Sequence, residues 1–142
     1  MFRPMLVAAV FVAGVTAVAA QSNPIAARKD IMKAVGDQTK IATAMVREQA
    51  PFDLEKAHQI FAAYAEAAAK MPALFPPDSK NGDTKAAPRV WESMDDFKAR
   101  FAKFEADAKA AGSAVKDLAS FKEQFAAVAK SCGGCHESYR LK

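Results

Sequence analysis

The sequence has no segment in which apolar and polar residues strictly alternate, which is the pattern of a half-buried β-strand. It also has no internal repeat and no low-complexity tract. Outside one motif near the C-terminus, it offers no paired nucleophile and base and no set of metal-ligand residues. These absences argue against a sheet-based fold, a repeat architecture and an enzyme.

A block of basic residues is also missing. The 142 residues include Lys+Arg 20 and Asp+Glu 16, for a formal net charge of +4, but the two signs are interleaved along the chain. No stripe combines aromatic and basic residues, so the positive balance does not indicate binding to nucleic acid. The length suits one domain and is short for two.

The N-terminus differs in composition from the rest of the chain. Residues 1–20 carry a single charge, Arg3, followed by an apolar run and then by small residues. This pattern predicts a signal peptide cleaved after Ala19 or Ala20, with export to the periplasm; an uncleaved anchor helix is the alternative. Removing Arg3 leaves 19 − 16 = +3 on the mature domain, residues 21–142.

The mature chain shows four amphipathic stretches with apolar residues at steps of three and four. Proline and glycine separate them, and one long loop is rich in turn residues. We therefore predict an all-α fold, an antiparallel four-helix bundle. The expected helices cover residues 24–49, 53–71, 88–111 and 113–139, and the loop covers residues 72–87.

Two further details of the sequence refine the prediction of a helical bundle: a glycine between two stretches and the apolar face of the last stretch. Gly112 lies between the third and fourth stretches, where it is expected to cap the third helix. The apolar stripe of the fourth helix continues through Cys132, Cys135, His136 and Tyr139. We expect these four side chains to face the interior of the bundle, where a large flat apolar ligand could replace core side chains.

The segment Cys132-Gly133-Gly134-Cys135-His136 has the Cys-x-x-Cys-His spacing of a covalent c-type haem site. On a helix its two sulfurs lie on one face about a turn apart, so each can form a thioether with one porphyrin vinyl group. His136 can then reach the iron as the proximal axial ligand. The two glycines leave room at the porphyrin edge, although each weakens the helix by roughly 1 kcal/mol.

Three other uses of the cysteines fit less well. A thioredoxin-like redox pair needs a strand–helix setting. A zinc site needs a fourth ligand, and only His58 is available to complete it. A disulfide between Cys132 and Cys135 would close a very short loop and stabilise little. Covalent haem c is therefore the predicted cofactor.

The second axial ligand is less clear from the residues alone. Met and His are the usual choices in electron-transfer haem proteins. Met32 lies on the core stripe of the first helix, but simple packing is the common role of a helical methionine. His58 borders the apolar face of the second helix and reads more simply as a surface or hydrogen-bonded histidine. The remaining candidates are Met45, Met71 and Met94.

The mature sequence resembles the class II c-type cytochromes, the cytochrome c′ group and its low-spin cytochrome c-556 relatives, which carry the haem motif at the end of the chain. The resemblance spans the mature chain. Besides the motif and the Glu137-Ser138-Tyr139-Arg140 that follows, it includes Arg28-x-x-x-Met32-Lys33, Ala50-Pro51-Phe52-Asp53, Leu74-Phe75-Pro76 and Pro88-Arg89-Val90-Trp91.

The resemblance implies roles for particular residues. The low-spin branch has a methionine four residues after an arginine, as Met32 follows Arg28, and this methionine is the distal axial ligand. Cytochromes c′ instead leave the iron five-coordinate to bind NO or CO. By the same resemblance Arg28 lies near a haem propionate, Arg140 near His136 and Trp91 close to the haem. Solvated arginines and plain core packing are the simpler alternatives.

The expected function is periplasmic electron transfer with His136 and Met32 as axial ligands, and gas binding at a five-coordinate iron is the alternative. We expect redox protein partners of acidic character, no nucleic acid and no membrane insertion after cleavage. A monomer and a homodimer fit equally well. The basic side chains expected around the exposed haem edge are Lys33, Lys130, Arg140 and Lys142.

Overall fold

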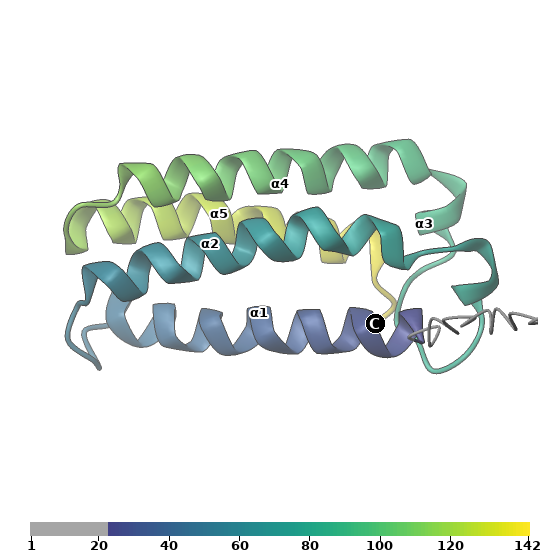
Figure 1. The fold of residues 1–142 in the computed structure, drawn as a ribbon, viewed down its shortest axis with the longest axis horizontal. Coiled ribbons are helices and arrows are strands. Elements are labelled where there is room, and N and C mark those ends of the chain that lie inside the picture. The colour runs from purple at the N-terminus through teal and green to yellow at the C-terminus, as the bar shows by residue number, and fades with distance from the viewer. Residues whose placement is uncertain (1–22) are drawn as a thin grey trace, which may run out of the picture.

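A computed structural model describes residues 23–142, so the predicted signal peptide lies outside the described residues. These residues form five α-helices, two short 3-10 helices and no β-strand (Figure 1). The elements are α1 (Pro24–Val46), α2 (Leu54–Lys70), η1 (Met71–Leu74), η2 (Pro77–Lys80), α3 (Arg89–Glu92), α4 (Met94–Ala114) and α5 (Leu118–Tyr139).

The long helices α1, α2, α4 and α5 run in alternating directions and form a four-helix bundle, which confirms the predicted all-α fold (Figure 1). The most extensive packing is between α2 and α4. Helix α3 and the C-terminus lie at the end of the bundle where α1 begins (Figure 1). Among the described helices none is long and apolar enough to cross a membrane.

Side-chain caps explain where three of the long helices begin. Asn23 Oδ1 accepts hydrogen bonds from the backbone of Ile25 at 3.0 Å and of Ala26 at 3.3 Å, with a proline at the first helical position. Asp53 caps α2, and Asp117 forms a capping box with Ser120. Each cap satisfies backbone N–H groups that have no partner in the first turn.

The prediction of one uninterrupted third helix from residue 88 is wrong. The chain leaves helical geometry at Ser93, where φ is −132° and ψ is 48°, so α3 and α4 are separate helices. The indole of Trp91 in α3 donates to the carbonyls of Phe75 and Pro76 at 3.1 and 3.2 Å. The loop therefore holds α3 at its own angle, which periodicity could not reveal.

The prediction that Gly112 caps the third helix is also wrong, because α4 continues through it to Ala114. A Cβ built at Gly112 would lie 3.3 Å from Cβ of Phe61, which is fully buried in α2. The glycine therefore permits the close approach of α4 to α2. Helix α5 begins at Leu118 rather than at residue 113, because the capping box of Asp117 sets its start.

The long loop is more ordered than its turn-rich sequence suggests. It contains η1 and η2, and its last residues pair with the end of α5. Ala87 N donates to the Tyr139 carbonyl at 2.9 Å and Leu141 N to the Lys85 carbonyl at 2.8 Å, around an isolated antiparallel bridge between Ala86 and Arg140. The C-terminal residues are thus tied to the loop.

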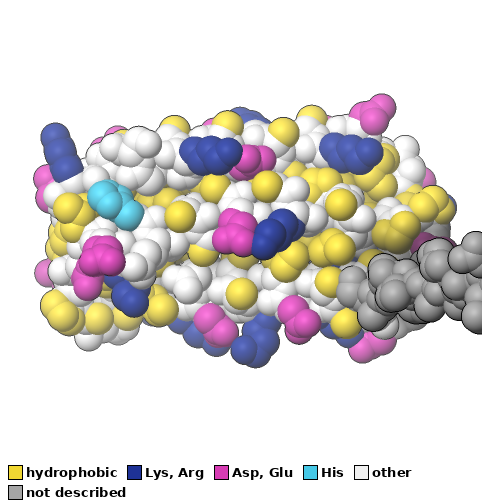
Figure 2. Space-filling model, viewed as in Figure 1, with side chains coloured by type: hydrophobic (Ala, Val, Ile, Leu, Met, Phe, Trp, Pro, Cys, Tyr) yellow, Lys and Arg dark blue, Asp and Glu magenta, His cyan; other side chains and the backbone are white. Residues whose placement is uncertain are grey.

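Charged side chains are spread over the surface as the sequence indicated. On the face shown in Figure 2, basic and acidic side chains are intermingled, with no broad area of one sign. Several are paired one helical turn apart, as in Glu66–Lys70 and Glu105–Lys109. Such exposed pairs each contribute only about 0.3–0.5 kcal/mol to stability.

We expect Gly112→Val to destabilise the protein by about 1–3 kcal/mol, because the added side chain would collide with Phe61 and push α4 from α2. Thermal unfolding followed by circular dichroism measures the effect. Ala110→Val, at an exposed position of α4, is the control for β-branching alone. Equal melting temperatures for the two variants would show that the close approach at Gly112 is unimportant.

Candidate haem site

One end of the bundle is built around a cavity of about 880 Å³, walled by α1, α4, α5 and the long loop. This volume is within the usual range for cofactor pockets. A cluster of core residues forms much of its wall, and Cys135 packs against that cluster. The cluster consists of Ala68, Met71, Val90, Phe97, Phe101 and Tyr139.

Helix α5 contributes Cys132, Gly134, Cys135 and His136 to this cavity. The two cysteines form no disulfide with each other and are half-buried, and burial raises the pKa of both thiols. His136 is exposed as a whole, but partial burial of its ring lowers its pKa, and the positive charge of Arg140 acts in the same direction. At neutral pH the imidazole is therefore kept in the neutral form that can bind a metal.

The glycines of the motif meet no neighbouring atom of the chain. A Cβ built at Gly133 or Gly134 has nothing within 4 Å, so packing within the protein does not require glycine there. Glycine still weakens a helix by about 1 kcal/mol relative to alanine. Open space above this turn, beside two thiols and an imidazole, fits a flat group attached to the cysteines.

Helix α1 forms the wall that carries Met32. Met32, Val35, Gly36 and Thr39 line the cavity from successive turns of one helical face. The Met32 side chain and the His136 imidazole therefore reach one cavity from two different helices. Met71 also lines the cavity but is fully buried in the core cluster.

The other sequence candidates lie elsewhere. Met45 is buried in the separate core cluster of the opposite half of the bundle, and Met94 does not line the cavity. The His58 ring nitrogen Nε2 lies 3.0 Å from the Val115 carbonyl oxygen, and this residue is likewise outside the cavity. The described residues contain no group of three or more His, Cys, Asp or Glu side chains placed to hold a metal ion.

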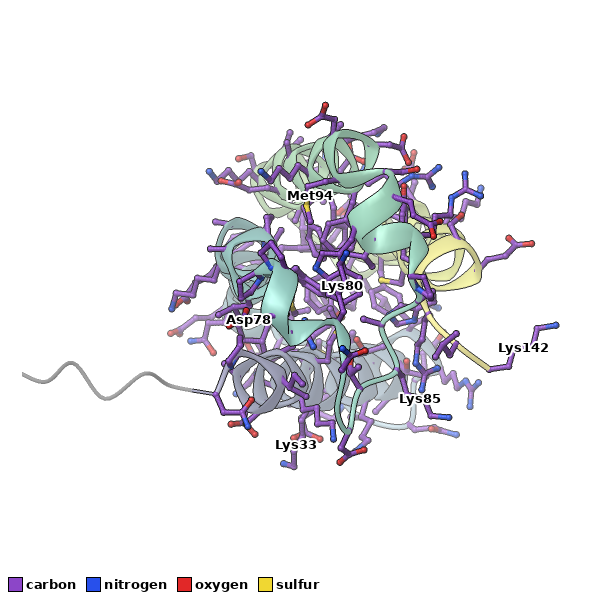
Figure 3. The ribbon with its side chains drawn as sticks, turned by 90° about the vertical axis from the view of Figure 1, so that its right-hand side faces the viewer. Lys33, Asp78, Lys80, Lys85, Met94 and Lys142 are labelled. Atoms are coloured by element: carbon purple, nitrogen blue, oxygen red, sulfur yellow. The ribbon has the colours of Figure 1, made fainter. Side chains whose placement is uncertain are left out.

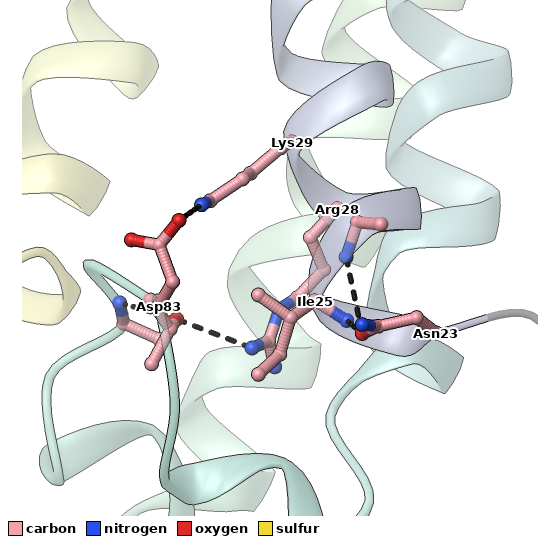
Figure 4. A network of polar contacts seen from close by, with 8 residues as sticks. Asn23, Ile25, Arg28, Lys29 and Asp83 are labelled. Carbon is pink, nitrogen blue, oxygen red and sulfur yellow. Dashed lines mark hydrogen bonds and ion pairs between the residues drawn. The ribbon is translucent and has the colours of Figure 1, made fainter.

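Arg28 is 5% exposed, and its guanidinium ties α1 to the long loop (Figure 4). Nη1 donates to the Leu74 carbonyl and Ser79 Oγ, both at 3.1 Å. Nη2 donates to the Ser79 carbonyl at 3.2 Å and to Thr84 Oγ1 at 3.1 Å. The guanidinium also lies 4.4 Å from the Phe75 ring centroid.

All four hydrogen-bond acceptors of Arg28 are neutral, and burial lowers its pKa. Buried charges in proteins are normally paired with an opposite charge. Because Arg28 lines the cavity, an anionic group bound there could supply that charge. The neighbouring Lys29 does have a carboxylate partner, Asp83, in an exposed ion pair (Figure 4).

Trp91 does not line the cavity. Its ring lies behind Phe75, which does, with the centroids 6.0 Å apart. The tryptophan thus supports the cavity wall from the second layer. Arg140, by contrast, lines the cavity directly at the end of α5.

The charged side chains that line the cavity are all basic, with no Asp or Glu among them. Of the four basic residues expected around the haem edge, only Arg140 belongs to this set; Figure 3 shows Lys33 and Lys142 directed away from the bundle. Sequence reasoning missed Lys29, Lys85, Arg100 and Lys103. Lys85 could not be placed from helical periodicity because it reaches the cavity from the loop. The six lining cations are Arg28, Lys29, Lys85, Arg100, Lys103 and Arg140.

These features together fit a covalent haem: a large apolar cavity, two cysteines one turn apart that are not joined to each other, an imidazole with a lowered pKa beside them, and cations for carboxylate groups. Cys132 and Cys135 would hold the group by thioethers and His136 would face its iron. The apolar walls would exclude water from it.

Comparison with known proteins agrees with this fit. A family model described as "Cytochrome C'" matches residues 23–140. Cytochrome c′ of Rhodopseudomonas palustris is 42% identical over 99% of this chain and 97% of its own length. A cytochrome c-556 of Agrobacterium tumefaciens is 36% identical over 81% of this chain and 94% of its own.

The fold has the same relatives. The solved structure of cytochrome c′ from Rhodopseudomonas palustris superimposes with a TM-score of 0.83 at 43% identity, covering 86% of this chain and 98% of the solved one. Relatives named cytochrome c′ and relatives named cytochrome c-556 are both similar to this chain. The names therefore leave open which of the two branches it follows.

We expect Arg28→Met to destabilise the protein by about 2–4 kcal/mol, because four loop acceptors lose a charged donor while the apolar stem is kept. Denaturant unfolding gives the free energy, and limited proteolysis reports loosening of residues 72–87. Lys40→Met, at an exposed position of α1, is the control. An unchanged loop in Arg28→Met would contradict the clamping role.

Proposed function

Because the chain belongs to the cytochrome c′ family and carries covalently attached haem c, we propose that it is a periplasmic electron-transfer protein with His136 and Met32 as axial ligands. The observation that carries this proposal is the convergence of Met32 from α1 and His136 from α5 on one cavity. Residues 1–20 serve as the export signal, and the mature domain is residues 21–142.

The haem supplies an iron that takes up and releases one electron. Cys132 and Cys135 would attach the ring to α5, and His136 and Met32 would bind its iron from two different helices. With both ligands bound, little has to move when the electron is exchanged. The Met32 thioether is a soft ligand and favours the reduced state relative to a second histidine.

Arg28 and Arg140 serve the carboxylates of the haem in this proposal. Arg28 is buried at the cavity with neutral acceptors only, so a propionate would supply its missing counter-charge. Arg140 lines the cavity near His136, where its positive charge adds to the effect of burial in lowering the pKa of that imidazole. Trp91 acts through Phe75, whose position it fixes.

Gas binding at a five-coordinate iron is the second candidate, favoured by the 42% identity to a protein named cytochrome c′. In that case Met32 would only pack against the haem. Gly36, one turn after Met32, leaves space on the same wall, since a Cβ there would meet nothing within 4 Å. The two candidates differ in whether the Met32 sulfur binds the iron.

We expect the purified protein to show low-spin bands in both redox states, and Met32→Ala to convert the ferrous form to a high-spin species that readily takes up CO. Removing the thioether opens the sixth coordination position. Visible spectroscopy with CO titration makes the measurement. Met94→Ala, which removes a methionine outside the cavity, is the matched control.

A high-spin wild-type spectrum with ready CO uptake would support gas binding instead. An unchanged low-spin spectrum in Met32→Ala would show that another side chain is the ligand.

The six basic side chains that line the cavity favour a redox partner with an acidic surface. Lys29, Arg100 and Lys103 pair with acidic side chains, whereas Lys85 and Arg140 have no such pair among the described residues; Lys85 Nζ instead donates to the main-chain oxygen of Lys142 at 3.1 Å. A partner that presents carboxylates to this edge would be steered by long-range attraction. Lys33, Lys130 and Lys142 lie outside the cavity and would add to the general positive charge.

We expect Lys85→Gln to slow electron transfer to an acidic partner several-fold at low ionic strength, with the difference disappearing as salt rises. Lys130→Gln, outside the cavity lining, should have a smaller effect although it removes the same charge. Stopped-flow kinetics over a range of salt concentrations compares them. Equal slowing by both variants would show that only the net charge matters.

A further inference from the structure

Tyr139 brings a polar group into the cavity wall next to the haem motif. It follows Cys135 by four residues and His136 by three, so it shares their face of α5. The side chain lines the cavity, is 4% exposed, and packs edge-on against Phe97 with 5.1 Å between ring centroids. Its hydroxyl donates a hydrogen bond to the carboxylate of Asp96 in α4.

Asp96 itself does not line the cavity, and its side chain is 52% exposed. The same carboxylate oxygen accepts a hydrogen bond from Arg100 Nε at 2.8 Å. The hydrogen bonds from Tyr139 and then from Arg100 lower the pKa of Asp96, so it is ionised at neutral pH. Tyr139 thus links a solvent-facing negative charge to the cavity wall.

Two guanidinium groups flank the same ring. The guanidinium carbon of Arg100 lies 5.5 Å from the Tyr139 ring centroid, and that of Arg89 lies 5.9 Å from it. Among the described residues, Asp96 is the carboxylate that is hydrogen-bonded to both Tyr139 and Arg100. Without it, no carboxylate hydrogen-bonded to Tyr139 would offset the two positive charges near the ring.

We propose that Asp96, acting through Tyr139, lowers the reduction potential of the haem by placing a negative charge behind the part of the cavity wall that Tyr139 forms next to Cys135. Both are positioning residues: neither would touch the iron. The inference rests on the proposed attachment through Cys135 and His136 but not on ligation by Met32. A negative charge near the haem stabilises the oxidised state, which has one more positive charge.

A purely structural role for the same hydrogen bond makes a different prediction. If the Tyr139–Asp96 bond only fastens α5 to α4, its loss lowers stability and leaves the potential where it was. The reduction potential is therefore the measurement that separates the two roles, with the melting temperature recorded alongside.

The test compares midpoint potentials of the haem-loaded mature protein and its variants by spectroelectrochemistry. Asp96→Asn keeps a hydrogen-bond acceptor and removes the charge. We expect it to shift the redox equilibrium constant about threefold toward the reduced state, which raises the potential by about 28 mV at 59 mV per decade. Tyr139→Phe should raise it by less, because the carboxylate survives but turns to solvent. The double variant should match Asp96→Asn, since the two residues act as one unit.

Glu105→Gln is the matched control. Glu105 also lies in α4 and pairs with a basic residue one turn on, Lys109, but neither residue lines the haem cavity. It is nine residues from Asp96, about 13.5 Å along the helix. The reduction potential of the Glu105→Gln variant should equal that of the unmodified protein.

An unchanged potential in Asp96→Asn, or a shift equal to that of Glu105→Gln, overturns the inference. Failure of the proposed ligand set would show separately, as a high-spin spectrum of the unmodified protein. A lowered melting temperature with an unchanged potential would establish the Tyr139–Asp96 bond as a fastening between helices only.

Discussion

Half of this bundle has a conventional core, and the other half buries its apolar side chains on the walls of a cavity. In the first half Phe61, Tyr64 and Phe121 pack against one another edge to face or nearly so. In the second half Phe97, Phe101 and Tyr139 line an open volume. The apolar contacts that would complete this second core must come from a bound group, and the family's covalent haem is such a group. Its attachment, ligands and surrounding charges all depend on this division.

Arg28 connects the cavity half of the bundle to the long loop. It stands one turn before Met32 on α1, so its four hydrogen bonds to the loop also fix the helical face that carries Met32. The loop in turn pairs with the residues after the haem motif, through Ala86 and Arg140. A single buried guanidinium and a short backbone bridge thereby connect, through the loop, the helix α1 that carries Met32 and the end of the helix α5 that carries His136. The charged side chains that line the cavity are basic, and the carboxylate of Asp96 lies outside it, hydrogen-bonded to Tyr139 of the wall.

The sequence predicted the helices and the haem motif because both depend on local spacing. Periodicity of three and four residues located the four long helices, and Cys132, Cys135 and His136 came from a motif with a fixed geometry. Contacts between distant segments could not be read in this way. The break at Ser93 depends on the loop that holds Trp91, and Gly112 is explained only by the approach of α4 to Phe61. The hydrogen bond between Tyr139 and Asp96 joins residues that are 43 positions apart on two helices, and the apolar periodicity of either helix does not predict it.

The central claim is that Met32 of α1 and His136 of α5 both bind the haem iron. Proton–carbon NMR of the reduced protein, with the methionine methyl groups labelled, tests it most directly. The described residues contain four methionines, Met32, Met45, Met71 and Met94. If Met32 binds the iron, one methyl signal should lie far upfield of the others, because the methyl group is held above the porphyrin ring. This signal should disappear in Met32→Ala. Four methyl signals without such a shift, or an upfield signal that survives in Met32→Ala, would contradict it.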